Sequence, residues 1–435
     1  MATPELKTRR AFLRSAVLGG ALTWTVPTFL ARTIDTLAAD QEMAGSAKAA
    51  VDLPVLVVLQ LAGGNDGLNT VVPWNNDHYR RARPKLAIAR DGLLPVNDDY
   101  AFPVALAGFR DLQELGHLSV VHGVGYPNPN RSHFRSMEIW QTASDADRVE
   151  RRGWIGRYFD CCCQGADPTV GVSMGGTMPQ AFQARRPTGI AVASARRPSR
   201  PARDSASDPM TMSGRDDGTE AGEAVSGDSI GAVAGGRSTE VALLDFLDRT
   251  ALDARISDRR MREIAGKTSN AMAYPETALG QSLKQVAQWI AGRLPTRVYY
   301  LSHGGFDTHR GQALTHERLL RELGEGMRAF VEDLKGLKVF ERVLVVAFSE
   351  FGRRVGENAS GGTDHGAAGP VFVFGQHLRK PWIGKHPSLD PADLNRGDLQ
   401  YGVDFRSVYA EALEGWLGTS SERILGRRFD RLQIV

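Results

Sequence analysis

The 435-residue sequence predicts an α/β protein with a mostly parallel central sheet flanked by helices. Short runs rich in Val, Leu and Phe are typical of strands that are buried on both faces of a parallel sheet. Each run ends in glycine and polar residues, which is typical of the loops that leave such strands. An amphipathic segment joins two of the runs, as in a βαβ unit with a right-handed crossover.

Five strands are predicted from the apolar runs. In chain order they are residues 54–61, 118–123, 297–301, 342–348 and 370–375. The first run is almost entirely Val and Leu, which predicts a strand with both faces covered. The strand–helix–strand order of the third and fourth runs makes the sheet mostly parallel.

Helices are predicted where apolar residues recur with a period near 3.6. The longest covers residues 313–337, where the apolar stripe includes Leu319, Leu323, Met327, Phe330 and Leu334. Shorter helical patterns cover residues 132–142, 154–160, 239–264 and 279–293. Ser132 is a suitable N-cap for the first of these, which gives it a structural alternative to a functional role.

Three segments of different composition organise the chain. Residues 1–39 have the character of a signal peptide, and residues 50–435 hold the α/β domain. Within that domain, residues 196–238 contain almost no bulky apolar side chains, which predicts a low-complexity surface linker. The domain is long enough to bury a large hydrophobic core.

The N-terminal segment resembles a twin-arginine export signal. Arg9 and Arg10 are followed by Ala-Phe-Leu and by a moderately apolar run at residues 15–31, which is too short and too rich in Gly and Thr for a membrane span. Small residues predict cleavage near Ala38 or Ala39. A chance arginine pair in an arginine-rich chain is the alternative interpretation.

Export by this route predicts a periplasmic or secreted protein that has the twin-arginine export machinery as a partner. Proteins that use the route fold before export, often with a cofactor or metal already bound, which motivates a search for a metal site. No other segment reaches the roughly 18 uninterrupted apolar residues of a membrane helix, so no stable membrane span is expected.

Charge and cysteine content exclude two other classes of function. The net charge of +3 gives no general attraction to nucleic acid, and no nucleic-acid partner is expected. The three cysteines are consecutive, Cys161–Cys163, and form neither a disulfide framework nor the spaced pairs of a zinc ribbon. They are predicted to be packed as small apolar residues, with a redox or metal-binding role as the alternative.

Polar residues follow the ends of four predicted strands, and a further Gly-rich loop at residues 361–366 precedes the last strand. In open α/β sheets, ligands bind outside the carboxyl ends of the strands, so these side chains are expected at one edge of the sheet. Carboxylates and imidazoles from separate loops suit Zn²⁺, Mn²⁺ or Mg²⁺. The candidates are Asp66, Ser132, His133, Asp307, His309, Glu350, Asp364 and His365.

Some candidates have simpler interpretations. Asp66 stands in an Asn-Asp-Gly sequence, where Asp is also a common turn residue. Asp307 and His309 would point the same way on extended backbone, which suits chelation, but a local hydrogen bond is equally consistent with that spacing. Glu350 directly after a buried strand and Asp364 in a Gly-rich loop lack a core role, which favours function.

Five ordered motifs together resemble the domain-of-unknown-function 1501 family. They are Leu-Ala-Gly-Gly-Asn-Asp-Gly-Leu-Asn-Thr at 61–70, Asn-Arg-Ser-His-Phe at 130–134, Gly-Phe-Asp-Thr-His at 305–309, Ser-Glu-Phe-Gly-Arg at 349–353 and Gly-Thr-Asp-His-Gly at 362–366. The family consists of bacterial proteins that commonly carry twin-arginine signals and is placed in the alkaline phosphatase and sulfatase clan. The resemblance covers about residues 54–430 and implies an alkaline phosphatase-like fold.

The resemblance also implies roles for individual residues. Metal phosphatases of the clan have a ligand Asp after the first strand, which Asp66 matches, and a nucleophilic Ser or Thr at the start of a helix, which Ser132 matches. A metal-binding Asp with a nearby His, an acidic residue and a final His follow in that order. The matching residues are Asp307, His309, Glu350 and His365.

The chain departs from the clan at three points. Asp307 and His309 are closer together in sequence than is usual, and Glu350-Phe351 stands where the clan usually has Asp-His, which removes one ligand. No Cys-x-Pro-x-Arg sequence occurs, so a formylglycine sulfatase is not expected.

These observations lead to the hypothesis of an exported metal-dependent hydrolase that acts on phosphate or sulfate esters of a small molecule or polymer. One or two divalent ions (Zn, Mn or Mg) would be bound by Asp66, Asp307, His309, Glu350, Asp364 and His365. Ser132 would be the nucleophile, His133 an acid or a ligand, and Arg353 an oxyanion clamp. The alternative is a secreted, non-catalytic binding or assembly protein on the same fold.

Overall fold

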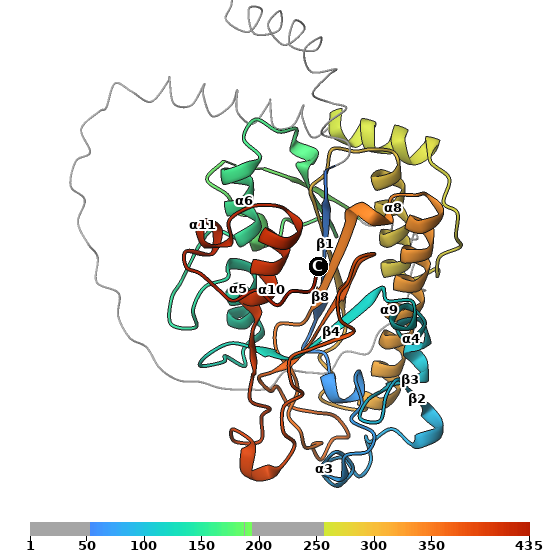
Figure 1. Ribbon diagram of the computed structural model, residues 1–435, viewed down its shortest axis with the longest axis vertical. Helices are drawn as coiled ribbons and strands as arrows, with labels where there is room; N and C mark the ends of the chain where they lie inside the picture. The colour runs from blue at the N-terminus through green and yellow to red at the C-terminus, as the bar shows by residue number, and fades with distance from the viewer. Residues whose placement is uncertain (1–52, 187, 194–255) are drawn as a thin grey trace, which may run out of the picture. The chain divides into compact units, whose positions relative to one another are not determined.

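A nine-stranded sheet forms the centre of the computed structural model, which describes residues 53–186, 188–193 and 256–435 (Figure 1). The strands follow the order β10-β4-β9-β8-β1-β7-β5-β6 across the sheet, and β11 pairs with β4. A separate two-stranded sheet pairs β2 (Leu93–Pro95) with β3 (Ala101–Pro103). The strands of the large sheet are β1 (Val55–Ala62), β4 (Leu118–Gly125), β5 (Gly171–Met174), β6 (Ile190–Val192), β7 (Val298–Gly304), β8 (Val343–Phe348), β9 (Gly369–Phe374), β10 (Trp382–Ile383) and β11 (Val403–Asp404).

All five predicted strands are present, as β1, β4, β7, β8 and β9. Parallel pairing joins β1 to β7 and β8, and joins β5 to β6 and β7. In contrast, β9 runs antiparallel to both of its neighbours, β4 and β8. The predicted α/β class with a mostly parallel central sheet is therefore confirmed. Strands β5, β6, β10 and β11 were not predicted, because strands of two to four residues leave no distinct apolar run in the sequence.

Helices cover both faces of the sheet (Figure 1). The first face carries α4 (Ala107–Glu114), α8 (Ala278–Ala291) and α9 (Gln312–Gly336). The second face carries α5 (His133–Thr142), α6 (Trp154–Cys162), α10 (Phe405–Ala410) and α11 (Ser421–Leu425). Side chains of β1 alternate between the two cores, with Val57 and Leu59 in the first and Leu56 and Val58 in the second.

Two other α-helical segments are present in the described residues. A short helix, α3 (Asp77–Ala82), follows the loop after β1, and residues 256–267 form a helix that packs against the first core through Met261. The predicted signal peptide at 1–39, the linker at 196–238 and the first part of the helix predicted at 239–264 fall outside the described residues. Within the described ranges, no helix is both long and apolar enough to cross a membrane.

The reversed direction of β9 brings a fifth loop to the functional edge of the sheet. The loops after β1, β4, β7 and β8 leave that edge, because these four strands run in the same direction. An antiparallel strand starts where its neighbours end. The Gly-rich loop at 361–366, which precedes β9, therefore meets the other four loops there.

The cysteines differ in their surroundings. Cys162 is exposed, whereas Cys161 and Cys163 are half-buried, and Cys163 packs against the second core. The prediction of small packed residues therefore describes Cys163 but not Cys162. All three thiols are free.

A buried histidine on β4 makes the stability of the fold sensitive to acid. The His122 ring stacks on Trp382 with centroids 5.2 Å apart, and its Nε2 has no hydrogen-bond partner among the described residues. Burial, with a smaller contribution from the nearby His386, lowers the pKa of His122 to about 3. The unfolded chain, with a pKa of about 6.5 at this residue, binds more protons between these two values, so stability falls as the pH falls.

We expect His122 alone to lower the free energy of unfolding by about 2 kcal/mol between pH 7 and pH 5. The measurement is urea denaturation of the wild type and of His122→Phe, which keeps an aromatic ring beside Trp382. The stability of the variant relative to the wild type should rise by that amount on acidification. A difference that is the same at both pH values would contradict the prediction.

Candidate metal centre

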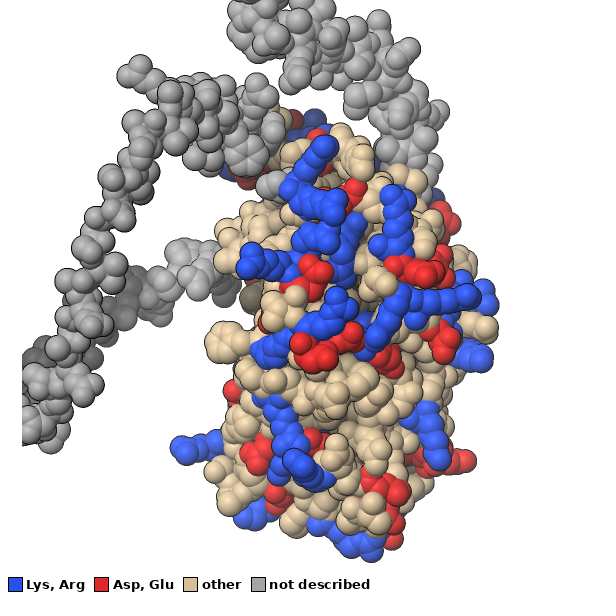
Figure 2. All heavy atoms as spheres, turned by 90° about the vertical axis from the view of Figure 1, so that its left-hand side faces the viewer, with Lys and Arg blue, Asp and Glu red and all other residues tan. Residues whose placement is uncertain are grey.

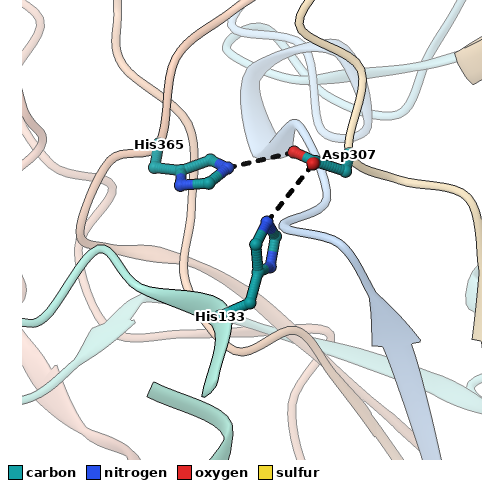
Figure 3. A group of neighbouring side chains, drawn as sticks. All are labelled: His133, Asp307 and His365. Carbon is teal, nitrogen blue, oxygen red and sulfur yellow. Dashed lines mark hydrogen bonds and ion pairs between the residues drawn. The ribbon is translucent and has the colours of Figure 1, made fainter. Parts of the chain in front are cut away.

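Loops from three parts of the chain bring two histidines against one carboxylate (Figure 3). His133 is the first residue of α5, Asp307 lies in the loop after β7, and His365 lies in the loop before β9. The Nε2 atom of His365 is 3.0 Å from Oδ1 of Asp307, and Nε2 of His133 is 3.4 Å from Oδ2. One donor atom from each of the three residues lies within 4.8 Å of the others, close enough to share a metal ion.

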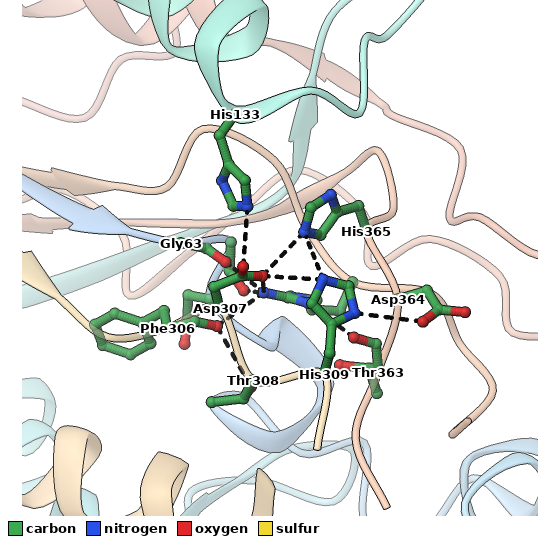
Figure 4. Close-up of polar contacts among 12 residues, drawn as sticks. Gly63, His133, Phe306, Asp307, Thr308, His309, Thr363, Asp364 and His365 are labelled. Carbon is green, nitrogen blue, oxygen red and sulfur yellow. Dashed lines mark hydrogen bonds and ion pairs between the residues drawn. The ribbon is translucent and has the colours of Figure 1, made fainter. Parts of the chain in front are cut away.

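His309 adds a third imidazole to this group (Figure 4). Its Nε2 atom lies 2.8 Å from Nε2 of His365 and 3.0 Å from Oδ1 of Asp307. We call His133, Asp307, His309 and His365 the His₃Asp cluster. Asp307 and His309 had been predicted as a chelating pair at positions i and i+2, and the structure places both in the cluster.

The outer nitrogen of each imidazole is held by a hydrogen-bond acceptor. The Nδ1 atom of His133 lies 2.9 Å from Glu350 Oε1, and that of His365 lies 2.8 Å from the carbonyl oxygen of Arg131. The Nδ1 atom of His309 lies 3.4 Å from Asp364 Oδ1.

An Asp307 oxygen also lies within hydrogen-bond distance of Nε2 of His365 and of His309. With an ion at the centre of the cluster, the acceptors at the three Nδ1 atoms would hold the imidazole protons there. The three Nε2 lone pairs are then left for the interior of the cluster. Histidines that bind metals show this same pattern, in which the other ring nitrogen donates to a carboxylate or carbonyl group.

The contacts of Asp307 with the three imidazoles, and the contact between His309 and His365, have the spacing of neighbouring donors around a tetrahedral ion. With metal–donor bonds of about 2.1 Å, tetrahedral geometry separates neighbouring donors by about 3.3 Å. The contacts within the cluster range from 2.8 to 3.4 Å. Two unprotonated nitrogens only 2.8 Å apart repel each other unless a cation or proton lies between them. Three imidazoles and one carboxylate form a donor set that suits Zn²⁺.

Protonation also favours ligation by these residues. Burial alone would raise the pKa of Asp307, but contacts with His365 and Arg353 outweigh it and lower the pKa to about 2. Burial lowers the pKa of His365, which favours the neutral ring that a metal requires. The carboxylate is therefore ionised, and the His365 imidazole is neutral, at physiological pH.

Arg353 holds the loops of the site in place. Its side chain is fully buried and donates to the carbonyl oxygens of Gly64, Thr363 and Phe306 at 2.6, 2.7 and 2.9 Å, and to that of Gly63. It also donates to Asp307 Oδ1 at 2.9 Å. This differs from the predicted role as an oxyanion clamp, because a buried guanidinium engaged with four carbonyl groups and a carboxylate cannot reach a substrate.

Close backbone contacts explain two glycines in the motifs. A Cβ atom at Gly63 would collide with the backbone nitrogen of Asp307, and one at Gly362 would collide with the backbone of His309. Gly63 also has a φ of 119°, a conformation that other residues rarely adopt. The Gly-rich sequences at 63–64 and 361–362 therefore let the loops approach each other closely enough to form the cluster.

Two predicted metal ligands lie one layer behind the cluster. Glu350 is fully buried, and its Oε1 atom accepts from the backbone N–H of Gly63 at 2.8 Å while it contacts His133. Asp364 contacts His309 and accepts from Asn358 at 3.1 Å. In this arrangement both carboxylates contact the outer nitrogen of a histidine, the position of a residue that orients a ligand. Direct coordination by Glu350 and Asp364 stays a prediction.

Asp66 occupies a different environment from the predicted one. It forms a buried ion pair with Arg83 at 2.6 Å and accepts a hydrogen bond from Gln312. Burial alone would raise the pKa of Asp66, but the Arg83 charge and hydrogen bond outweigh it and lower the pKa. An arginine thus neutralises this carboxylate, and the structure does not bring Asp66 into the cluster.

Ser132 is exposed at the N-cap position of α5, immediately before His133. Ser132 therefore occupies the N-cap position predicted from the sequence, although its side chain makes no capping hydrogen bond. The backbone N–H groups of His133, Phe134 and Arg135 have no acceptor among the described residues. The start of α5 therefore presents a free hydroxyl group and free amides beside His133.

Two participants were missed by sequence reasoning. The Arg131 carbonyl group could not be singled out, because every residue has one. Arg83 lies in a segment with three other arginines, at positions 80, 81 and 90, and no pattern distinguishes it from them.

Comparisons with known proteins give one family match and several distant structural similarities. No curated protein matches the sequence. The structure of Ps i-CgsB is similar with a TM-score of 0.36 and 9% identity, and the match covers 87% of this chain and 73% of that one. For the zinc complex of the C-terminal periplasmic domain of EcEptC from Escherichia coli, the TM-score is 0.35 and the identity 10%, with coverage of 74% and 73%.

The lipoteichoic acid synthase LtaP from Listeria monocytogenes gives a TM-score of 0.38 at 6% identity, covering 86% of this chain and 75% of that one. The family match lies in the C-terminal part of the chain and includes three of the five motifs, those at 305–309, 349–353 and 362–366. Residues 249–425 match the family described as protein of unknown function DUF1501, which confirms the resemblance predicted from the sequence.

Proposed function

We propose that this protein is a metal-dependent hydrolase of phosphate or sulfate esters, with one divalent ion held by the His₃Asp cluster. One observation carries the proposal: three imidazole Nε2 atoms converge on the Asp307 carboxylate while an acceptor holds each Nδ1. The class of ester rests on the sequence resemblance to the phosphatase and sulfatase clan. Zn²⁺ is the ion that the donor set favours.

The residues around the cluster support ester chemistry. A bound divalent ion would supply Lewis acidity, polarising an ester oxygen and easing deprotonation of a nearby hydroxyl group. Ser132 is the exposed hydroxyl next to the cluster and is the proposed nucleophile. The free amides at the start of α5 would donate to the anionic group of the ester, helped by the helix dipole.

A single ion is proposed because the ligands predicted for a second ion are otherwise engaged. Asp66 is paired with Arg83, and Glu350 is buried behind His133 with its Oε1 atom on Gly63 N–H. Metal analysis by plasma mass spectrometry of protein purified without chelator should therefore give about one equivalent, rather than two.

Replacement of Ser132 by Ala tests the role of the hydroxyl group. Loss of a nucleophile that acts with a neighbouring metal should lower kcat by about a thousandfold or more. Metal content should stay unchanged, because the Ser132 side chain makes no hydrogen bond with the described residues of the cluster. The measurement is turnover of a panel of phosphate and sulfate esters, paired with metal analysis, and Ser360→Ala in an exposed neighbouring loop is the matched control.

Full turnover by metal-loaded Ser132→Ala would exclude the proposed nucleophile. The burial of Arg353 favours the second candidate function, a secreted binding protein, because the centre then lacks the arginine expected to clamp an oxyanion. If the metal-loaded wild type turns over none of the esters, the hydrolase proposal fails and the binding protein is the remaining interpretation.

A further inference from the structure

A cleft lined by arginines lies at the far end of α5 from the metal cluster. Its volume is about 330 Å³, and it is bounded by the loop after α5 and by residues of α10, α11 and the C-terminal loop. Among the described residues, the lining includes two carboxylates, Asp145 and Glu150. Six arginines line it: Arg148, Arg152, Arg157, Arg406, Arg423 and Arg427. Figure 2 views the side of the molecule that carries α5, α6, α10 and α11, where Lys and Arg side chains are numerous.

Two of the six arginines have structural roles. Arg406 is buried and forms a bidentate pair with Asp404 at 2.6 and 2.8 Å. Arg157 donates to the carbonyl oxygens of Thr142, Arg152 and Ile424, which ties the loop after α5 to α11. These contacts explain why both side chains lie in the floor of the cleft.

The other arginines are not required by the fold in this way. Arg148 and Arg423 are exposed, and their side chains make no hydrogen bond or ion pair with the described residues. Arg152 has one distant partner, Glu150, at 3.8 Å. Arg427 and Arg406 both donate a hydrogen bond to Asp145 Oδ1, and the guanidinium carbon of Arg427 lies 4.9 Å from the ring centre of Phe429.

The positive charges of the cleft exceed its negative charges. After Arg406 and Arg427 are paired with Asp404 and Asp145, one carboxylate, Glu150, remains for the other four arginines. Arg157 has no carboxylate partner within ion-pair distance among the described residues. Burial, opposed by Glu150 and reinforced by Arg152, lowers the pKa of Arg157 to about 10, so that it stays charged at neutral pH.

A guanidinium group matches the geometry of a tetrahedral oxyanion, to which it donates two parallel N–H groups. We propose that this cleft binds a sulfate or phosphate group, as an anion site separate from the metal centre. The ten residues of α5 separate the two sites by about 15 Å. The inference goes beyond the proposed hydrolase and does not depend on it, because no residue of the His₃Asp cluster lines the cleft.

The test is calorimetric titration of the full-length protein with inorganic sulfate and inorganic phosphate, at constant ionic strength with chloride as the background anion. The variant Arg148→Gln/Arg423→Gln removes two cleft charges that support no other contact. Its matched control, Arg318→Gln/Arg321→Gln, changes the net charge equally on α9, on the opposite face of the sheet. We expect the dissociation constant to rise at least tenfold in the cleft variant and to stay unchanged in the control.

A third variant, His365→Ala, separates this site from the metal centre. Cleft binding should persist in it, whereas any oxyanion binding that requires the metal should disappear. Binding that is lost in His365→Ala and unaffected in the cleft variant would overturn the inference. So would equal affinities in the cleft variant and its α9 control, or the absence of saturable binding to the wild type.

A sulfated tetrasaccharide and a short polyphosphate distinguish the sources of the anionic group. If one of these binds more tightly than the inorganic ions, and the cleft variant loses this binding, the ligand is an anionic group carried on a polymer. Equal or weaker binding of both identifies a free inorganic ion as the ligand. Either result, together with the dependence on Arg148 and Arg423, supports a sulfate or phosphate site.

Discussion

Replacing Asp307 with Asn, or His365 with Ala, is expected to remove the bound metal ion and abolish ester hydrolysis. Asp307 is the carboxylate on which the three imidazoles converge, at 3.0 Å from His365 and from His309 and 3.4 Å from His133. Loss of this ionised ligand leaves only neutral donors, and loss of His365 opens the cluster on one side. We expect metal content to fall from about one equivalent to below a tenth, and turnover to fall by about a thousandfold or more.

The measurement pairs plasma mass spectrometry with turnover of the preferred ester. Glu350→Gln is the comparison variant, in which we expect a smaller loss of metal, because Glu350 contacts His133 Nδ1 rather than the interior of the cluster. Changes at such supporting positions lower metal affinity by about 10- to 100-fold. A higher concentration of added metal should therefore restore ester turnover by Glu350→Gln. It should not restore turnover by Asp307→Asn. Normal metal content in Asp307→Asn would show that the ion binds elsewhere.

Much of the fold could be predicted from local sequence patterns. Val and Leu runs identified the long strands, because a strand that is buried on both faces is apolar along its whole length. The 3.6-residue period identified α9, because a helix that is buried along one stripe has apolar residues at that spacing. The reversed direction of β9 was not predicted, because its sequence is as apolar as that of a parallel strand. Its direction depends on pairing with β4 and β8, which are distant in the chain.

The site was predicted in part, for the same physical reasons. The loops that contain Asp307, His309 and His365 follow or precede strands at one edge of the sheet. The order and direction of the strands are therefore enough to bring these loops together. The sequence could not show which oxygen or nitrogen faces the centre. Glu350 lies behind His133 because its Oε1 atom also satisfies the Gly63 N–H, a contact between residues 287 positions apart.

Long-range pairing also explains the two residues whose roles were predicted differently. Asp66 and Arg353 are each held by partners that no local motif reveals. Arg83 pairs with Oδ2 of Asp66, and carbonyl groups of three loops accept from Arg353. In an arginine-rich chain, an arginine that holds the fold and one that binds an anion look alike in sequence. Only burial and the partners of the donors separate them.

Replacing Arg83 with Met is expected to destabilise the protein by about 3–5 kcal/mol, because it leaves the buried charge of Asp66 without its partner. Both side chains are completely buried and lie 2.6 Å apart. Arg83 also donates to the carbonyl oxygens of Val355 and Arg354, at 2.8 and 3.0 Å, and these would lose a donor. Urea denaturation measures the change, and Arg81→Met, at an exposed position on α3, should change stability by less than about 0.5 kcal/mol.

The double variant Arg83→Met/Asp66→Asn separates the two roles considered for Asp66. Removing both charges takes away the unpaired carboxylate, so the double variant should recover part of the stability that Arg83→Met loses. If Asp66 serves the fold, Asp66→Asn and the double variant lose stability but keep about one equivalent of metal. If Asp66 is a ligand, as the sequence resemblance implied, both lose the ion while still folded. Metal content in these folded variants therefore decides between the buried ion pair with Arg83 and direct coordination.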